Sequence, residues 1–208
     1  MYVPPAFRED DPVELRRIMR EARLATLVTM TADGLLATPL PLFLEDEGEH
    51  GVLCGHLAKA NPQWKTPAAG EALVIFSGPD AYVTPSWYAT KQEHGKVVPT
   101  WNYVAVHAYG QAEFFEDEDR LLDMVTRLTD LHEGSREAPW GVTDAPEMFI
   151  KSQLKGIVGL RIPISRIEGK RKMSQNRPAA DREGVAGGLA ASERPSDRHV
   201  APLVARPT

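Results

Sequence analysis

Short apolar segments separated by turn residues make up most of the chain before residue 170. Leu24 to Thr31 is rich in β-branched and apolar residues, and a second segment, Leu35 to Leu44, follows it across Ala32-Asp33-Gly34. Because Asp-Gly tolerates the positive φ of a tight turn, the two segments predict a β-hairpin. Pro39 and Pro41 remove ladder N–H groups, so the second strand is predicted to lie at an edge or to bend sharply.

The same alternation of apolar runs and turn signals predicts further strands later in the chain. They are Val52–Gly55, Ala72–Ser77, Ala81–Tyr88, Pro99–Phe115 and Ile157–Ile167. Gly78-Pro79-Asp80 is predicted to turn the chain and Thr90 to Lys96 to form a polar loop. Pro163 again indicates an edge strand or a bend.

Helical spacing of apolar residues predicts three helices among these strands. The first begins at Asp11-Pro12, with Asp11 as N-cap, and the second runs from the cap Asp117 to about His132. The third follows Asp144 and ends at Gly156. Strands in meander order with helices at the start, middle and end predict a small antiparallel barrel with helices packed outside it.

The composition changes after Arg177. Residues 178–208 contain mostly Ala, Gly, Pro, Ser and charged residues and few that could form a core. We therefore expect one domain over residues 1–177. The extension, residues 178–208, is expected to form at most a weak helix (Asp181 to Ala191) and then a flexible tail.

Charge and cysteine content narrow the classes of partner. The net charge of −5 over 208 residues provides no general attraction to nucleic acid or membranes. The single cysteine, Cys54, lies in an apolar run and is predicted to be a buried small hydrophobe, which fits a reducing cytoplasm. The N-terminus lacks the apolar stretch of a signal peptide, and no stretch is long enough to span a membrane.

The segment Gly55-His56-Leu57-Ala58-Lys59-Ala60-Asn61-Pro62 is the first candidate site. It follows an apolar strand and resembles the first turn of a helix, where free N–H groups and the helix dipole attract an anion. Lys59 adds a cation, His56 a donor and Asn61 an amide, so the segment is interpreted as a flavin-phosphate site. The alternative is an ordinary surface turn.

Two other segments are rich in groups that recognise ligands. Trp87-Tyr88 and Trp101-Asn102-Tyr103 place aromatic rings beside hydroxyl and amide groups, as a flat ring system requires, although both tryptophans could instead fill a core or a subunit contact. Glu168 to Arg177 contains four cations and several amides, which favours an anion; the alternative is a solvated strand end.

Several chemistries find no support in the sequence. The six histidines show no metal-ligand spacing, and a metal site is not expected. A Gly-x-Ser-x-Gly motif and a Gly-rich nucleotide loop are both absent, and no catalytic residue can be identified. The first helix carries Arg16, Arg17, Arg20 and Arg23, which form either a solvated face or a small nucleic-acid contact.

Four segments together resemble a known family. They are Met1-Tyr2-Val3-Pro4-Pro5-Ala6-Phe7, His56-Leu57-Ala58-Lys59-Ala60-Asn61-Pro62-Gln63-Trp64, Val98-Pro99-Thr100-Trp101-Asn102-Tyr103 and Lys172-Met173-Ser174-Gln175-Asn176-Arg177. They are similar to the PaiB-type, FMN-binding negative transcriptional regulators. The resemblance implies a split β-barrel with flanking helices, related to pyridoxamine-phosphate-oxidase-like flavoproteins, and a homodimer with FMN at the subunit interface. It also implies a role in repressing protease and sporulation genes.

The resemblance also implies roles for individual residues. His56, Lys59 and Asn61 would contact the FMN phosphate or ribityl chain, and Trp101 and Asn102 would meet the flavin ring. Lys172, Gln175, Asn176 and Arg177 would close the site, while Thr38 and Leu40 would approach the ring through backbone groups. Arg171 departs from the pattern, since many relatives carry Trp there.

Three functions remain open from the sequence. The first is an FMN-binding transcriptional regulator, and the second is an FMN-dependent oxidoreductase or flavin reductase of the split-barrel class. The third is a repressor that contacts DNA through its arginine-rich first helix. The acidic net charge and the lack of a helix-turn-helix argue against the third function.

Overall fold

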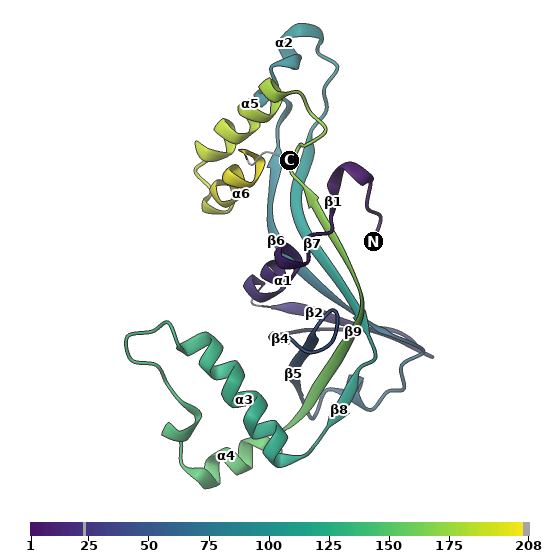
Figure 1. The fold of residues 1–208 in the computed structure, drawn as a ribbon, viewed down its shortest axis with the longest axis vertical. Helices are drawn as coiled ribbons and strands as arrows, with labels where there is room; N and C mark the ends of the chain where they lie inside the picture. Colours follow the sequence, from purple (N-terminus) through teal and green to yellow (C-terminus); the bar gives the residue numbers. More distant parts are fainter. Residues whose placement is uncertain (23, 206–208) are drawn as a thin grey trace. The chain divides into compact units, whose positions relative to one another are not determined.

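The computed structural model describes residues 1–22 and 24–205 and contains one large antiparallel sheet. The strand order is β3-β2-β6-β7-β9-β5-β4, and β1 and β8 also pair with β9 (Figure 1). The strands are β1 (Arg8–Glu9), β2 (Ala25–Thr31), β3 (Gly34–Leu40), β4 (Leu42–Glu45), β5 (Val52–Ala58), β6 (Ala72–Val83), β7 (Thr100–Gly110), β8 (Glu113–Phe115) and β9 (Ile157–Lys172).

Helices of very different length accompany the sheet. The α-helices are α1 (Pro12–Glu21), α2 (Thr90–His94), α3 (Glu118–Glu133), α4 (Glu147–Leu154), α5 (Ala179–Ala190) and α6 (Pro195–Ala205). Short 3₁₀ helices are η1 (Pro5–Phe7), η2 (Pro62–Trp64), η3 (Pro85–Trp87) and η4 (Val142–Asp144). None of the described helices combines the length and apolar character that crossing a lipid bilayer requires.

The chain divides into two compact units. Unit 1 contains Met1–Ile18, Ser77–Val106 and the chain from Glu168 onward. Unit 2 contains Met19–Phe76 and His107–Ile167. The long strands β6, β7 and β9 each contribute residues to both units.

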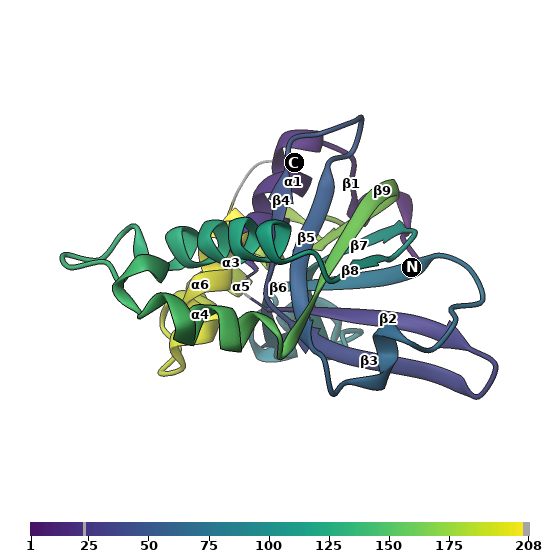
Figure 2. The same ribbon diagram turned by 90° about the horizontal axis from the view of Figure 1, so that it is seen from below.

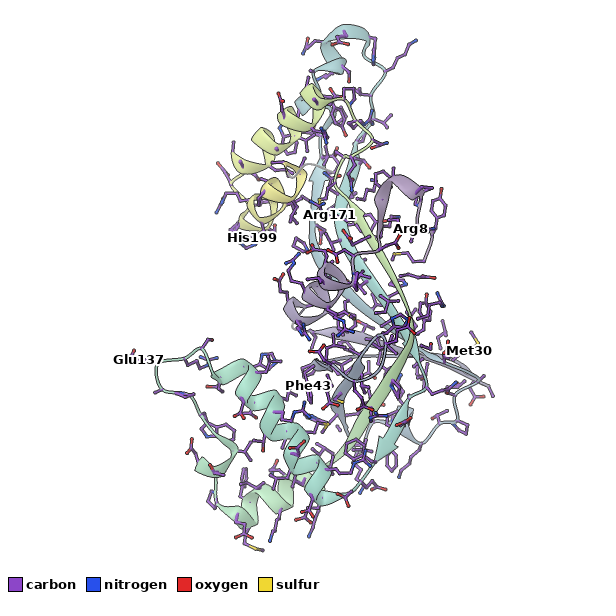
Figure 3. The ribbon with its side chains drawn as sticks, in the orientation of Figure 1. Arg8, Met30, Phe43, Glu137, Arg171 and His199 are labelled. Atoms are coloured by element: carbon purple, nitrogen blue, oxygen red, sulfur yellow. The ribbon has the colours of Figure 1, made fainter. Side chains whose placement is uncertain are left out.

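The β2–β3 hairpin of unit 2 confirms the prediction from Asp33-Gly34. The two strands pair from Ala25↔Leu40 to Thr31↔Gly34, and Gly34 has a φ of +119°. Figure 3 shows Met30 near the tip of this hairpin. As predicted from its prolines, β3 ends the strand order, and the extended chain is interrupted at Pro41 before β4.

Helices α3 and α4 lie side by side in unit 2 and cover a small apolar core (Figure 2). Buried Leu121, Met124 and Leu154 form its centre, and Phe43 and Ile157 are among the partly buried residues packed against it. The Asp117 carboxylate accepts a hydrogen bond from Arg120 N at 2.9 Å, which confirms the predicted cap of α3.

Unit 1 contains two helices where the sequence predicts a weak helix and a flexible tail. Helices α5 and α6 pack together (Figure 1). Val185, Leu189 and Val200 on these helices are completely buried. The Asp181 carboxylate, also fully buried, accepts hydrogen bonds from Thr90 N at 2.9 Å and Thr90 Oγ1 at 2.8 Å. These tertiary contacts stabilise the two helices, although the segment lacks the apolar periodicity that would predict them.

The segment between Ala72 and Lys96 also differs from its prediction. Gly78-Pro79-Asp80 does not turn the chain but continues within β6. A Cβ on Gly78 would lie 2.9 Å from Val104 Cβ of β7, so the glycine permits the close approach of β6 and β7. Part of the predicted polar loop, Thr90–His94, is the short helix α2, which Gly95 ends with a φ of +66°.

Pro163 lies in β9, an interior strand, so the predicted edge position is wrong. On one side Pro163 pairs with Val52 of β5. On the other side, β7 ends at Gly110 and β8 begins at Glu113, where it pairs with Arg161. The missing N–H therefore falls where the chain bordering β9 passes from one strand to the next.

Two glycines of α5 provide a matched test of how this helix packs. A Cβ on Gly184 would lie 2.0 Å from the Trp87 carbonyl oxygen, whereas one on Gly187 would have no neighbour within 4 Å. We expect Gly184→Ala to lower the free energy of unfolding by about 1–3 kcal/mol through overpacking. Gly187→Ala should raise it by about 0.5–1 kcal/mol, since alanine favours a helix. Urea unfolding measures both; equal effects would contradict this packing.

Candidate functional site

The segment from His56 to Pro62 does not form the predicted helix start. Strand β5 continues to Ala58, and a turn then leads to the three-residue 3₁₀ helix η2. Lys59 N donates to Gly156 O at 2.8 Å, and the Asn61 side chain accepts from Gln63 N at 2.9 Å. The interpretation as a helix N-terminus that binds an anion is therefore wrong, because these N–H groups have partners and the helix is very short.

Asn61 belongs to a polar network that reaches β3. Its Nδ2 donates to Thr38 Oγ1 at 2.9 Å, and Thr38 Oγ1 donates to Gln63 Oε1 at 2.5 Å. Gln63 Nε2 in turn donates to Thr29 Oγ1 at 3.0 Å. The structure thus brings Thr38 and Asn61 together, and Leu40, two residues along β3, is buried.

Gln63 is the central residue of this network, and sequence reasoning assigned it no role. It is only 2% exposed, and its side-chain amide uses both its oxygen and its nitrogen. Gln63 follows Asn61-Pro62 directly, and this position could have indicated its role, since a capping asparagine positions the residue two places later. The network stabilises the turn after β5.

Lys59 lies apart from this network and forms an ion pair with Glu116. Both side chains are about half exposed. An exposed pair of this kind contributes little to stability and can exchange partners.

His56 lines an apolar pocket with residues of α3, α4 and β9. Its Nδ1 is buried without a hydrogen-bond partner. Burial lowers the pKa of His56 below its usual 6.5, because it disfavours the charged imidazolium. The ring is therefore neutral at pH 7 and has no charge to offer a phosphate.

Cys54, on the same strand, is buried as predicted. Burial, together with the neighbouring Glu45 carboxylate, raises the pKa of Cys54 to about 12. A thiol with such a pKa stays protonated at neutral pH and is a poor nucleophile.

The second group of predicted residues lies in unit 1, around the end of β9. Lys172 Nζ donates to Trp101 O at 2.6 Å and also to Thr100 Oγ1. The pKa of Lys172 is lowered by burial first and then by the charges of Lys170 and Arg177. No carboxylate is among the groups that shift this pKa.

Trp101 and Asn102 have opposite environments. Trp101 is 52% exposed, and its ring meets that of Tyr82 edge-on at a centroid distance of 6.0 Å. Asn102 is fully buried, and its Nδ2 donates to Ser174 Oγ at 3.1 Å. Only Trp101 presents its side chain to a ligand, while Asn102 holds the turn after β9.

Gln175 and Asn176 also differ in accessibility. Gln175 Oε1 accepts from Met173 N at 2.6 Å, and its Nε2 donates to Arg171 O, so this amide braces the turn. Asn176 is exposed. The guanidinium of Arg177 lies 4.8 Å from the centre of the Tyr88 ring.

Three aromatic residues of unit 1 line an open groove of about 700 Å³. Tyr82, Trp87 and Trp101 form one part, and Gly188 and Arg194 come from the α5 helix and the chain before α6. A Cβ on Gly188 would lie 2.3 Å from the Trp87 ring, so the glycine allows that ring to pack directly on α5. The C-terminal segment therefore contributes to the groove. Arg171 Nη2 donates to Leu203 O at 2.7 Å and ties β9 to α6 (Figure 3).

Comparison with known proteins identifies the family. A family model described as "Putative FMN-binding domain" matches residues 1–166. The chain belongs to this FMN-binding family. FMN, the cofactor expected from the sequence, is the one that the family's description names.

Two relatives extend over most of the chain. "Protease synthase and sporulation protein PAI 2" of Bacillus subtilis (strain 168) is 36% identical over 205 residues, covering 98% of this chain and 96% of the relative. "Uncharacterized protein AN0679" of Emericella nidulans is 34% identical over 226 residues, with 91% and 90% covered. The resemblance to the PaiB type is confirmed.

Solved structures support the predicted fold class of this FMN-binding family member. The FAD and heme binding protein from Mycobacterium smegmatis matches with a TM-score of 0.60 at 16% identity, covering 93% of this chain and 96% of the other. The conserved hypothetical protein Rv2991 from Mycobacterium tuberculosis matches with a TM-score of 0.59 at 14% identity, covering 86% and 94%. The mainly β split-barrel fold with flanking helices is thereby confirmed.

The lowered pKa of His56 predicts a pH dependence of stability. Below about pH 6.5 the unfolded chain takes up a proton at His56 before the folded chain does. The free energy of unfolding should therefore fall as the pH decreases through this range, until the folded state also protonates. His56→Leu should reduce that fall. Urea unfolding from pH 7.5 to 5 measures it; an NMR-titrated pKa of 6.5 or above for His56 would contradict the burial effect.

Proposed function

We propose that this protein binds FMN through unit 1 and acts as a regulatory protein of the PaiB type. The observation that carries the proposal is the gathering of Lys170, Lys172 and Arg177 at the end of β9, where Lys172 Nζ lies beside Trp101 O at 2.6 Å. Burial first, and then the charges of Lys170 and Arg177, lower the pKa of Lys172, and no carboxylate is among the groups that shift it. An anion bound there would relieve the repulsion among like charges.

The chemistry of these residues fits FMN. The cofactor has a phosphate, which requires cations and N–H donors, and a flat ring system, which requires an aromatic surface. Lys172 and Arg177 would neutralise the phosphate, Asn176 would donate from its exposed amide, and Trp101 would contact the ring. FMN, when bound, supplies the capacity to accept and release electrons. The described residues would bind, orient and partly shield it.

The residues of unit 2 that the resemblance implies are proposed as the alternative set of contacts. Lys59 could reach an anion by giving up the exposed Glu116, whereas Thr38, Leu40 and Asn61 are engaged with protein groups. We exclude His56 from the set, because its neutral ring lines a separate apolar pocket.

The regulatory part of the proposal comes from similarity to PAI 2, which is named as a protease synthase and sporulation protein. We infer a homodimer and a cytoplasmic location from the family resemblance and from the single buried cysteine. A DNA contact through α1 has less support. Arg17 Nη2 pairs with Glu14 at 2.6 Å, and Arg20 Nη2 pairs with Asp46 at 2.7 Å. Arg16 also has an interaction partner, and Arg23 lies outside the described residues.

Comparing FMN with riboflavin, which lacks the phosphate, tests the role of Lys172. Lys172→Met keeps a side chain of similar length but removes the charge. We expect it to weaken FMN binding by about 10- to 100-fold, as for the loss of a charge-assisted hydrogen bond, and to leave riboflavin binding nearly unchanged. Flavin fluorescence quenching measures both affinities. Lys91→Gln, which alters an exposed lysine of the same unit, should change neither.

Two further variants distinguish a phosphate bound at Lys172 from a phosphate bound at Lys59. Trp101→Leu should weaken FMN and riboflavin binding by the same factor, because the ring is common to both ligands. Lys59→Ala should leave the FMN-to-riboflavin ratio unchanged if the phosphate lies at Lys172. A ratio that collapses in Lys59→Ala and survives in Lys172→Met would overturn our assignment.

Two measurements on the purified protein distinguish the two flavin functions. The absorbance spectrum, recorded after FMN is added and the excess removed, measures the retained flavin, and an assay with NADH or NADPH measures turnover. Flavin retained at one molecule per chain, without turnover of NADH or NADPH, supports a regulator. Turnover would favour the FMN-dependent oxidoreductase, for which the structure identifies no catalytic residue. Failure to retain FMN would contradict both.

A further inference from the structure

The pocket beside His56 is a separate feature of unit 2 and has a volume of about 280 Å³. Its walls are mostly apolar and come from four elements and the loop between α3 and α4. They include Val125 of α3, Ile150 and Leu154 of α4, Val142 and, from β9, Ile157. No lysine, arginine, aspartate or glutamate is among its lining residues.

Two half-exposed aromatic side chains line the pocket. Trp140 is 49% exposed and Phe149 is 56% exposed, and both line it. Large apolar side chains at an accessible position lose contact with water when a ligand covers them, which favours binding of an apolar molecule.

His56 is the one ionisable group on the pocket wall. Its Nδ1 is shielded from solvent and has no hydrogen-bond partner within the described chain. A buried N–H without an acceptor is costly, so the neutral ring favours the tautomer with its proton on Nε2. Nε2 is then the nitrogen that can donate to a ligand.

These features define the chemistry of the occupant. The apolar walls exclude charged groups, since no residue of opposite sign lines the pocket to compensate them. Its volume lies at the lower end for ligand pockets, which limits the occupant to one or two rings. Thr129 and Gln153 also line the pocket, but Thr129 Oγ1 already donates to Val125 O at 2.7 Å and Gln153 is exposed. The imidazole is therefore the group that accommodates a single oxygen function.

We propose that this pocket binds a small uncharged aromatic molecule whose one oxygen accepts a hydrogen bond from His56 Nε2. The site goes beyond the proposed flavin function and shares no residue with the set proposed for FMN. An occupant would bridge α3 and α4 to the sheet of unit 2, because its walls come from both helices and from β5 and β9.

Phenol and toluene are suitable probes, because they have nearly the same shape and differ by the oxygen. Isothermal titration calorimetry on the full-length protein should show saturable binding of phenol, and weaker binding of toluene. His56→Leu keeps the wall apolar and should weaken phenol binding by about tenfold, as for the loss of one neutral hydrogen bond, without weakening toluene binding. His132→Leu, on the exposed face of α3, should leave both unchanged.

Two pocket-filling variants locate the binding. Ala145→Phe places a ring inside the pocket, and Gln153→Phe fills it from an exposed position of α4 that can tolerate the change. Both should abolish binding of phenol and toluene while FMN binding persists, which shows that the variants are folded. Three results would overturn the proposal: no saturable phenol binding, phenol binding that survives both filling variants, or equal losses for phenol and toluene in His56→Leu.

Discussion

The backbone hydrogen bonds of β9 are the constraint on which both units depend. In unit 2 the strand pairs with β5 from Val52↔Pro163 to Ala58↔Ile157, and in unit 1 its far end pairs with β1 at Arg8↔Lys170. An interior strand must satisfy N–H and C=O groups along both edges, so its register is strongly specified. Residues two apart share a face of a strand, and a slip by one residue would turn Lys170 and Lys172 to the other face. The ladder thus maintains the repulsion between these lysines.

Elements with local signals were predictable from the sequence, and elements that depend on distant partners were not. The β2–β3 turn requires only the positive φ available at Gly34, and α3 begins at Asp117, whose own side chain caps it. Helix α5 has no such local cause, because Gly184 and Gly188 favour it only through contact with Trp87, about a hundred residues earlier. Composition alone therefore predicted a weak helix and a flexible tail where the structure has two packed helices.

In the candidate site, too, some features were predictable from the sequence and others were not. The residue types were recognisable from the motifs, but their roles depended on which donors were already used. Lys59 N bonds Gly156 O, and Asn61 bonds Thr38 and Gln63, which are partners that no local pattern reveals. His56 matched the motif, yet its environment is apolar. Sequence reasoning can therefore find a polar segment. Which of its donors and acceptors are already used within the protein becomes visible only in the fold.

The resemblance assigns both Lys59 and Lys172 to the cofactor. The electrostatic environments of these two side chains differ before any ligand binds. Lys59 already pairs with Glu116 at an exposed position, where an ion pair contributes little, so an anion that replaces Glu116 there gains little as well. Lys172 is partly desolvated and repelled by two cations, and an anion removes that repulsion. Affinity depends on the free-energy difference between the free and the bound protein. Lys172, whose environment in the free protein is the less favourable for its charge, therefore contributes more to affinity in our proposal. The proposed phosphate site at the end of β9 rests on this difference.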